Sequence, residues 1–274
     1  MEHIRQAVEL ARGAKSAGTQ PKLPTSAQQP RPSEPAPDRV GAGDTVIKEV
    51  PLNLAHLETN RIIAHDRSDL RSRSFDMLRT QVLQSMDLKS WQLLAVTSPT
   101  SACGKTLTTI NLALSIARQP ERSVLLVDMD IEKPQVANCL GLQRKSGLLS
   151  VLNGRVALQN ALVQASVGGY RLTVLPCEAS MSHSSEYMTS RAMSTLLQEI
   201  KNEDRSRIII FDMPPILSGD NVISILPQID CVLFVAAVGT TTASEIKECN
   251  KHLQTSAVVR VVLNKASELG PMYY

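Results

Sequence analysis

Aromatic side chains are scarce in this 274-residue chain, where Phe, Trp and Tyr together make up only 3% of the residues. Domains that bind nucleic acids by stacking bases on aromatic side chains are disfavoured by so few of them. The formal net charge of +3 is too small to indicate a basic surface for nucleic acid or membrane. Tyr273 and Tyr274 stand side by side at the last two positions. Composition alone assigns no role to this pair.

Paired cysteines and long apolar runs are also missing. The five cysteines are widely spaced and form no CxxC pair, which argues against a disulfide framework or a zinc site and favours a reducing cytoplasm. No uncharged apolar stretch approaches about 18 residues, so the sequence predicts no membrane-spanning helix. Residues 1–18 lack the apolar core of a signal peptide. We therefore expect a cytoplasmic protein that reaches a membrane only through a partner.

Composition divides the chain into four segments. Residues 1–17 have the pattern of a short amphipathic helix, which could dock on a partner or remain frayed. Residues 18–45 are rich in Pro, Ser, Ala, Gln and Gly and predict a disordered linker. Residues 46–268 would form the main domain, with 46–90 as its N-terminal arm and first helix. Residues 269–274 would be a tail that carries the tyrosine pair.

In the main domain, short apolar strands alternate with amphipathic helices. This alternation predicts an α/β domain with a doubly wound, mostly parallel sheet and helices on both faces. Strands are expected at 93–97, 124–128, 172–175, 208–211, 232–238 and 258–263. Helices are expected at 68–86, 105–118, 158–164, 185–201 and 242–254.

The segment from Thr97 to Thr106 has the strongest local signal for a binding site. A predicted strand runs there into a loop that ends Gly104-Lys105-Thr106 at the start of a helix. In such a loop, backbone N–H groups face a phosphate, the lysine reaches the β- and γ-phosphates, and the threonine can ligate Mg²⁺. The strict pattern has a glycine five residues before Gly104, where this chain has Pro99. Because Gly-Lys-Thr also occurs by chance, the prediction depends on the strand–loop–helix context.

Two more strands deliver carboxylates to the same edge of the predicted sheet. Asp128 and Asp130 come at the end of the strand 124–128, and Asp212 follows the strand 208–211. Carboxylates at the carboxyl ends of parallel strands lie in the ligand crevice of such a sheet, and alternation puts Asp128 and Asp130 on one face. We expect a site for Mg²⁺ and phosphate there. The alternative is that these acids are solvated and cap the next helix.

Three motifs, Ser98–Thr106, Asp128-Met129-Asp130 and Asp212–Pro215, resemble the Walker elements of the bacterial tyrosine kinases. These are cytoplasmic ATPase domains that autophosphorylate and control capsule or exopolysaccharide synthesis. The resemblance covers residues 50–274 and is strongest to the type in which the kinase is a separate soluble chain. It implies a P-loop NTPase fold, ATP and Mg²⁺ as cofactors, and ATP-dependent protein-tyrosine autokinase activity in trans, together with ATPase activity.

The resemblance also implies partners and residue roles. The partners would be a second copy in a homo-oligomer, protein tyrosine substrates, and a membrane polysaccharide co-polymerase as activator, which would hold the chain peripherally at the inner membrane. Lys105, Asp128 and Asp130 would be catalytic, with Asp128 activating the attacking tyrosine hydroxyl. Asn264 would lie near the adenine. The metal would be organised by Thr106, Asp130 and Asp212. The nucleotide would be bound by Ser101, Ala102, Cys103, Gly104, Lys105, Thr106, Leu107 and Asn264. The autophosphorylated residues would be Tyr273 and Tyr274.

The chain departs from the family pattern at several positions. Ala102 replaces a loop glycine, and a positive φ at this residue would strain the loop and weaken nucleotide binding. Glu132 replaces an arginine that commonly follows the paired aspartates. Arg73, Asp76 and Arg79 align with a Glu-x-x-Arg-x-x-Arg oligomerisation motif, but two of the three charges are inverted. These departures put full activity and ring assembly in question.

Two other functions remain open from the sequence. One is a non-kinase ATPase switch of the partitioning or cell-division type, although Thr100 stands where those ATPases carry an extra lysine. The other is a degenerate nucleotide-binding regulatory subunit of a polysaccharide assembly system, which Ala102 and Glu132 would explain. For Cys103, a small residue that fills a tight loop is favoured over a reactive thiol.

Overall fold

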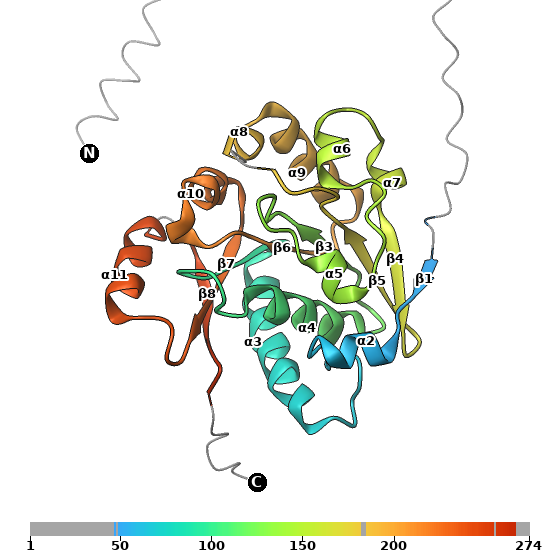
Figure 1. Ribbon diagram of the computed structural model, residues 1–274, viewed down its shortest axis with the longest axis horizontal. Helices are drawn as coiled ribbons and strands as arrows, with labels where there is room; N and C mark the ends of the chain where they lie inside the picture. Colours follow the sequence, from blue (N-terminus) through green and yellow to red (C-terminus); the bar gives the residue numbers. More distant parts are fainter. Residues whose placement is uncertain (1–46, 48, 182–184, 255, 267–274) are drawn as a thin grey trace, which may run out of the picture. The chain divides into compact units, whose positions relative to one another are not determined.

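A single eight-stranded sheet runs through the part of the chain that the computed structural model describes, which comprises residue 47 and residues 49–181, 185–254 and 256–266. The strand order is β1-β4-β5-β3-β6-β2-β7-β8 (Figure 1). All neighbouring strands are parallel except β4 and β5, which pair antiparallel. The predictions for residues 1–17, 18–45 and 269–274, including the tyrosine pair, fall outside the described residues.

The inner strands are continuous apolar runs because helices cover the sheet on both sides. β2 (Leu93–Thr97), β3 (Val124–Asp128) and β6 (Ile208–Asp212) are buried at every position. The other strands are β1 (Glu49–Pro51), β4 (Val163–Val167), β5 (Tyr170–Leu175), β7 (Cys231–Ala237) and β8 (Val258–Asn264). The six strands predicted from the sequence are therefore confirmed, with ends that differ by at most two residues.

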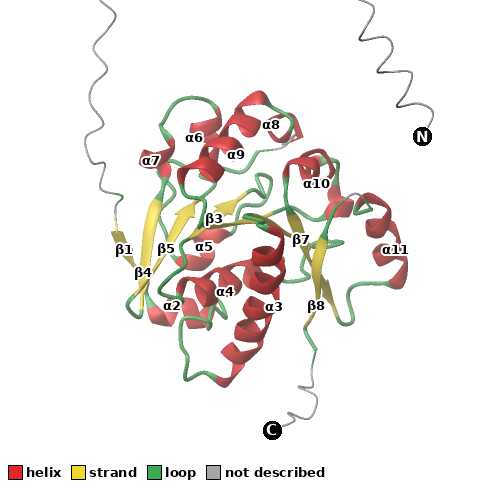
Figure 2. Ribbon diagram, turned by 180° about the vertical axis from the view of Figure 1, so that it is seen from behind, coloured by secondary structure: helices red, strands yellow, loops and turns green. Residues whose placement is uncertain are grey.

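The helices form two layers, and Figure 2 shows them in red around the yellow strands. One core cluster joins the sheet to α2 (Leu54–Thr59), α3 (Arg73–Lys89), α4 (Lys105–Ala117) and α5 (Val136–Leu140). A second core cluster joins it to α6 (Leu148–Leu152), α7 (Leu158–Ala161), α8 (Ser185–Met188), α9 (Arg191–Glu203), α10 (Asn221–Ile225) and α11 (Ala243–His252). Short 3₁₀ turns lie at Leu70–Ser72, Ile216–Ser218 and Leu226–Gln228. The doubly wound α/β prediction is confirmed.

The helix predicted at 158–164 is wrong in its second half. Helix α7 ends at Ala161, and β4 begins at Val163 and returns along β5 in an antiparallel hairpin through Gly168 and Gly169. The reason is tertiary, because β4 is held between β5 and the edge strand β1, and its side chains at Ala165 and Val167 are buried. The strand β1, which has only three residues, was also missed.

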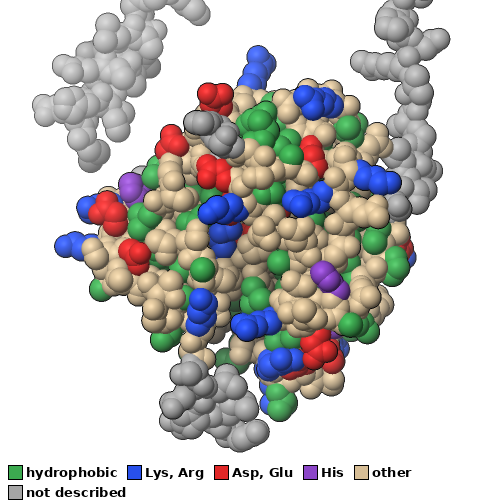
Figure 3. Space-filling model, viewed as in Figure 1, with side chains coloured by type: hydrophobic (Ala, Val, Ile, Leu, Met, Phe, Trp, Pro, Cys, Tyr) green, Lys and Arg blue, Asp and Glu red, His purple; other side chains and the backbone are tan. Residues whose placement is uncertain are grey.

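Neither the described helices nor the face shown in Figure 3 indicates contact with a membrane or with a large charged partner. No helix among the described residues is long and apolar enough to cross a membrane. On the face shown in Figure 3, the blue Lys and Arg side chains are interspersed with red Asp and Glu side chains. This distribution agrees with the small net charge of the sequence.

Asp76 fixes α3 to α4. Its carboxylate accepts hydrogen bonds from Ser115 Oγ at 2.6 Å, Arg118 Nη2 at 3.0 Å and Arg79 Nη1 at 3.1 Å. The Arg118 side chain is only 4% exposed, so Asp76 neutralises a buried guanidinium. Two members of the aligned oligomerisation motif, Asp76 and Arg79, thus face α4, whereas Arg73 is exposed. In this chain Asp76 acts as an internal counter-ion.

Replacing Asp76 by Ala is expected to lower the free energy of unfolding by about 2–4 kcal/mol, because the buried guanidinium of Arg118 loses its carboxylate. Asp87, also on α3, is the matched control. It is 48% exposed and paired with the partly exposed Arg122, so Asp87→Ala should cost at most about 1 kcal/mol. Urea unfolding compares the two variants, and equal losses would contradict the anchoring role.

Candidate active site

The loop between β2 and α4 has a backbone conformation that most residues avoid. Ala102 has a φ of 64° and Gly104 a φ of 90°, both in the left-handed region. Glycine adopts this region freely, whereas the Cβ of alanine makes it strained. The loop is braced by the segment after β6, because Ile216 N donates to Ser98 O at 2.8 Å and Leu217 N to Pro99 O at 3.1 Å. The strain anticipated at Ala102 is therefore present.

Helix α4 begins directly after this loop. Its N-cap is Gly104, which has no side chain to bond the first-turn amides. Those amides, together with the positive end of the helix dipole, are the groups that bind phosphate in other loops of this kind. Ser101 and Ala102 are exposed at the tip of the loop, and Leu107 is partly exposed in the first turn of α4. The loop is therefore built for an anion.

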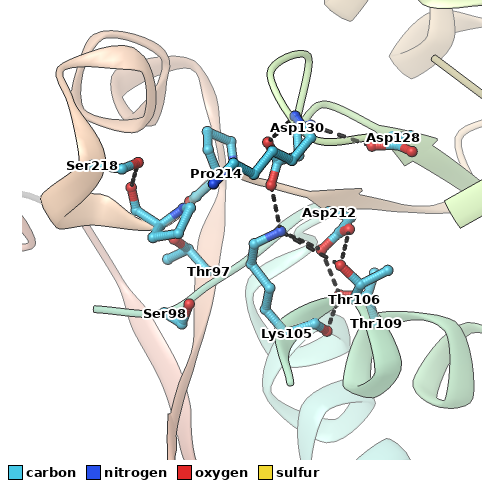
Figure 4. A network of polar contacts seen from close by, with 12 residues as sticks. Thr97, Ser98, Lys105, Thr106, Thr109, Asp128, Asp130, Asp212, Pro214 and Ser218 are labelled. Carbon is cyan, nitrogen blue, oxygen red and sulfur yellow. Dashed lines mark hydrogen bonds and ion pairs between the residues drawn. The ribbon is translucent and has the colours of Figure 1, made fainter. Parts of the chain in front are cut away.

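Lys105 stands at the centre of a buried charge cluster (Figure 4). Its Nζ lies 2.7 Å from Asp130 Oδ2 and 3.6 Å from Asp212 Oδ1. Thr106 Oγ1 donates to Asp212 Oδ2 at 2.6 Å. The side chains of Lys105, Asp130 and Asp212 are 11%, 7% and 0% exposed. Residues predicted from three separate motifs thus meet at the carboxyl edge of the sheet.

The buried charges shift one another's pKa values. Burial opposes the charged form of Lys105, but the carboxylates of Asp212 and Asp130 outweigh it and raise the pKa of the ammonium group. Burial raises the pKa of Asp212, although the Lys105 charge opposes the shift. Burial, reinforced by the charge of Asp212, raises the pKa of Asp128 well above its ordinary range. Lys105 therefore stays charged, and Asp128 is a stronger proton acceptor than an exposed aspartate.

Asp128 lies opposite Asp212 in the register of β3 and β6. Its Oδ2 accepts from Val136 N, the first residue of α5, at 3.0 Å, and its Oδ1 accepts from Asp130 N at 3.3 Å. Asp128 is fully buried. Asp128 thus bonds the start of α5, but it is buried, so the alternative of a solvated capping acid does not describe it. Asp130 instead reaches Lys105.

Asp128→Asn is expected to raise the melting temperature of the metal-free protein at about pH 8. Because folding raises the pKa of Asp128, the folded state favours the protonated carboxyl. The contribution of Asp128 to stability is therefore complete below about pH 4, the ordinary range for aspartate, and is lost as the pH rises through the raised pKa. Asparagine has no such charge, so Tm should increase by about 2 °C or more and depend less on pH. Thermal unfolding in EDTA measures this, and a lower Tm would contradict it.

Thr109 also belongs to the site, although no motif in the sequence indicated it. This buried residue lies one helical turn after Lys105, and its Oγ1 donates to Lys105 O at 2.8 Å and lies 3.4 Å from Asp212 Oδ1. It helps to orient the carboxylate that Thr106 also contacts. The spacing of four residues within the predicted helix was the signal that could have found it.

Asn264 and Cys103 meet at the side of the phosphate loop. Asn264 Nδ2 donates to Cys103 O at 2.9 Å. The Cys103 side chain is fully buried, with its Sγ 3.5 Å from Thr241 Oγ1. These contacts agree with a packing role for the cysteine.

The oxygen atoms of this site fit Mg²⁺. Among the described residues there is no group of three or more His, Cys, Asp or Glu side chains arranged to hold a metal ion. Mg²⁺ does not need one, because it typically takes one or two carboxylates, several waters and phosphate oxygens. Thr106 Oγ1 and the carboxylates of Asp212 and Asp130 supply such ligands, directly or through water. The donor set therefore suits a magnesium–phosphate complex.

A strand, a phosphate loop and a helix, with acids at the ends of two strands on one side, define a P-loop nucleoside triphosphatase. The same fold places Lys105 and Thr106 at the start of α4. The chain belongs to the AAA domain family, whose model matches residues 92–256.

Several individual proteins similar to this chain are named as tyrosine kinases. The EpsB protein of Ralstonia nicotianae is 28% identical over 254 residues, which cover 88% of this chain and 33% of EpsB. The tyrosine-protein kinase YwqD of Bacillus subtilis is 28% identical and is covered over 93% of its length, against 80% of this chain. The solved structure of the VpsO kinase domain has a TM-score of 0.63 at 26% identity and covers 72% of this chain and 97% of that domain. The resemblance to bacterial tyrosine kinases is confirmed, although the chain spans only about a third of the length of EpsB.

Proposed function

We propose that the chain is an ATP-dependent protein-tyrosine kinase that phosphorylates Tyr273 and Tyr274 of a second copy. The observation that carries this proposal is the convergence of Lys105, Thr106 and Asp212 below the phosphate loop. The similarity to YwqD, which is named as a tyrosine-protein kinase, supports tyrosine as the acceptor. The main domain would be residues 46–268.

Each side chain of the site would have a separate role in phosphoryl transfer. Lys105 would exchange its contact with Asp130 for the β- and γ-phosphate oxygens, and Asp212 and Thr106 would hold the metal. Mg²⁺, when bound, neutralises charge on the phosphates. The tyrosine oxygen forms the new O–P bond, the bond from the γ-phosphorus to ADP breaks, and Asp128 takes the phenolic proton. Asp128 lies opposite Asp212 at the ends of β3 and β6, which places a carboxylate base beside the proposed metal site.

The cellular setting is part of the same proposal. By analogy with the family, the kinase would regulate exopolysaccharide or capsule assembly, work as a homo-oligomer, and be activated by the cytoplasmic part of a membrane polysaccharide co-polymerase. Its place would then be the cytoplasm, peripheral to the inner membrane. The relatives named as kinases support this setting, and co-purification with a co-polymerase tests it.

Mass spectrometry after incubation with Mg²⁺ and ATP tests the activity. We expect phosphate on Tyr273, Tyr274 or both, and no tyrosine phosphorylation in a variant with both changed to Phe. Tyr170→Phe, in β5, is the matched control and should leave the signal unchanged. Wild-type protein that stays unphosphorylated even with a co-polymerase tail present would refute the proposal. So would a signal that survives the double substitution.

A further inference from the structure

Asn264 contacts the phosphate loop rather than standing apart from it. It is the last residue of β8 and pairs with Ala237 of β7. Its Oδ1 accepts from Lys265 N at 2.8 Å, while its Nδ2 donates to Cys103 O at 2.9 Å. Because the carbonyl side of the amide is used locally, the amino side faces the loop. This orientation requires an amide, since a carboxylate has no hydrogen to donate.

The loop at this point needs an external constraint. Cys103 lies between Ala102 and Gly104, which both have a left-handed backbone. A neutral hydrogen bond is worth about as much as the strain of one non-glycine residue in that region. The bond from Asn264 to Cys103 O can therefore offset the strain that comes from having alanine where related loops have glycine.

Two further contacts come from the same side. A Cβ on Gly104 would lie 2.1 Å from Asn264 Nδ2, so the amide packs directly against the glycine. Thr241, in the loop after β7, accepts from Ala237 N at 3.0 Å, and its Oγ1 lies 3.5 Å from Cys103 Sγ. The end of β8 thus contacts the backbone of the phosphate loop, and the loop after β7 contacts its Cys103 side chain.

We infer that Asn264 is a positioning residue that holds the phosphate loop in its binding conformation, whether or not it also contacts the base. This inference rests on the proposed nucleotide binding. The positioning role predicts an effect that a contact with the adenine alone does not. Losing the amide should weaken the binding of a phosphate ligand that contains no base.

Calorimetric titration with two probes, Mg²⁺–pyrophosphate and Mg²⁺–ADP, tests the inference. Asn264→Ala should weaken pyrophosphate binding by about fivefold, the loss of one neutral hydrogen bond, and ADP binding by at least as much. Arg260→Ala, on the same strand but bonded to Gln81 on α3, is the control and should leave both affinities unchanged. Pyrophosphate affinity equal to wild type in Asn264→Ala would overturn the inference.

A second variant keeps the test decisive if Asn264→Ala does not fold. Thr241→Val removes the hydroxyl beside Cys103 Sγ and should weaken pyrophosphate binding by about twofold or more. The effect is smaller because a contact with sulfur is weaker than the hydrogen bond from the Asn264 amide. Unchanged affinity there would count against the inference. Failure of the broader proposal looks different, because a wild-type chain that binds neither probe is no nucleotide-binding protein. If the wild-type chain binds both probes and Asn264→Ala binds them with unchanged affinity, only the positioning role is refuted.

Discussion

Lys105→Met is expected to lower the rate of phosphoryl transfer by at least about 10²–10³-fold, the usual loss when one preorganised charge-stabilising donor is removed. Lys105 is the cation that contacts both Asp130 and Asp212, and it starts the helix that follows the phosphate loop. Methionine keeps the length of the side chain without its charge. Single-turnover phosphorylation of Tyr273 and Tyr274 measures the effect.

The same substitution should also destabilise the nucleotide-free protein. The fully buried Asp212 and the nearly buried Asp130 lose their counter-ion, and breaking a buried pair from one side typically costs about 3–5 kcal/mol. Adding Asp130→Asn to Lys105→Met should recover part of this stability but none of the transfer. Lys251→Met, at an exposed lysine on α11, should change neither. Transfer near the wild-type rate in Lys105→Met would rule out the assigned role.

Gly104→Ala is expected to reduce nucleotide affinity by at least about tenfold. At a φ of 90° the alanine is strained by about 1–2 kcal/mol, and its Cβ would lie 2.1 Å from Asn264 Nδ2. Either the Asn264 amide must then leave Cys103 O or the loop must shift, and both changes disturb the backbone that would bind the phosphates. Titration with Mg²⁺–ADP measures the loss.

Gly169→Ala is the control that has the backbone strain of Gly104→Ala without the close contact with Asn264. Gly169 has a similar φ of 83° in the hairpin between β4 and β5, but a Cβ there would have no neighbour within 4 Å. This variant should lose about as much stability from strain and keep its nucleotide affinity. If Gly104→Ala bound nucleotide as tightly as Gly169→Ala does, the close approach of Asn264 would be irrelevant to binding.

The sequence predicted those parts of the fold that local pattern decides. β2, β3 and β6 each consist of four apolar residues followed by Thr or Asp, and they were located almost to the residue. β4 was missed because Val163–Val167 includes Gln and Ser and becomes a strand only by pairing with β5. Pairing partners distant in sequence leave no local signal.

For the site too, the sequence predicted the residues but not all of their contacts. Motifs identified Lys105, Asp130 and Asp212, and the parallel sheet implied that they meet. The direct contact of Lys105 with Asp130 depends on side-chain geometry and has no signature in the sequence. The bond from Asn264 to Cys103 joins residues separated by 161 positions, so only the folded chain reveals it.

Asp76 also constrains how this chain could change over evolution. An arginine at this position, as in the oligomerisation motif, would place a third guanidinium beside Arg79 and the buried Arg118, with no carboxylate between them. Replacing Arg118 alone would leave Asp76 without one of its two guanidinium partners. Each single substitution would therefore give a less stable protein, and a change of charge at Asp76 requires a compensating substitution at Arg118.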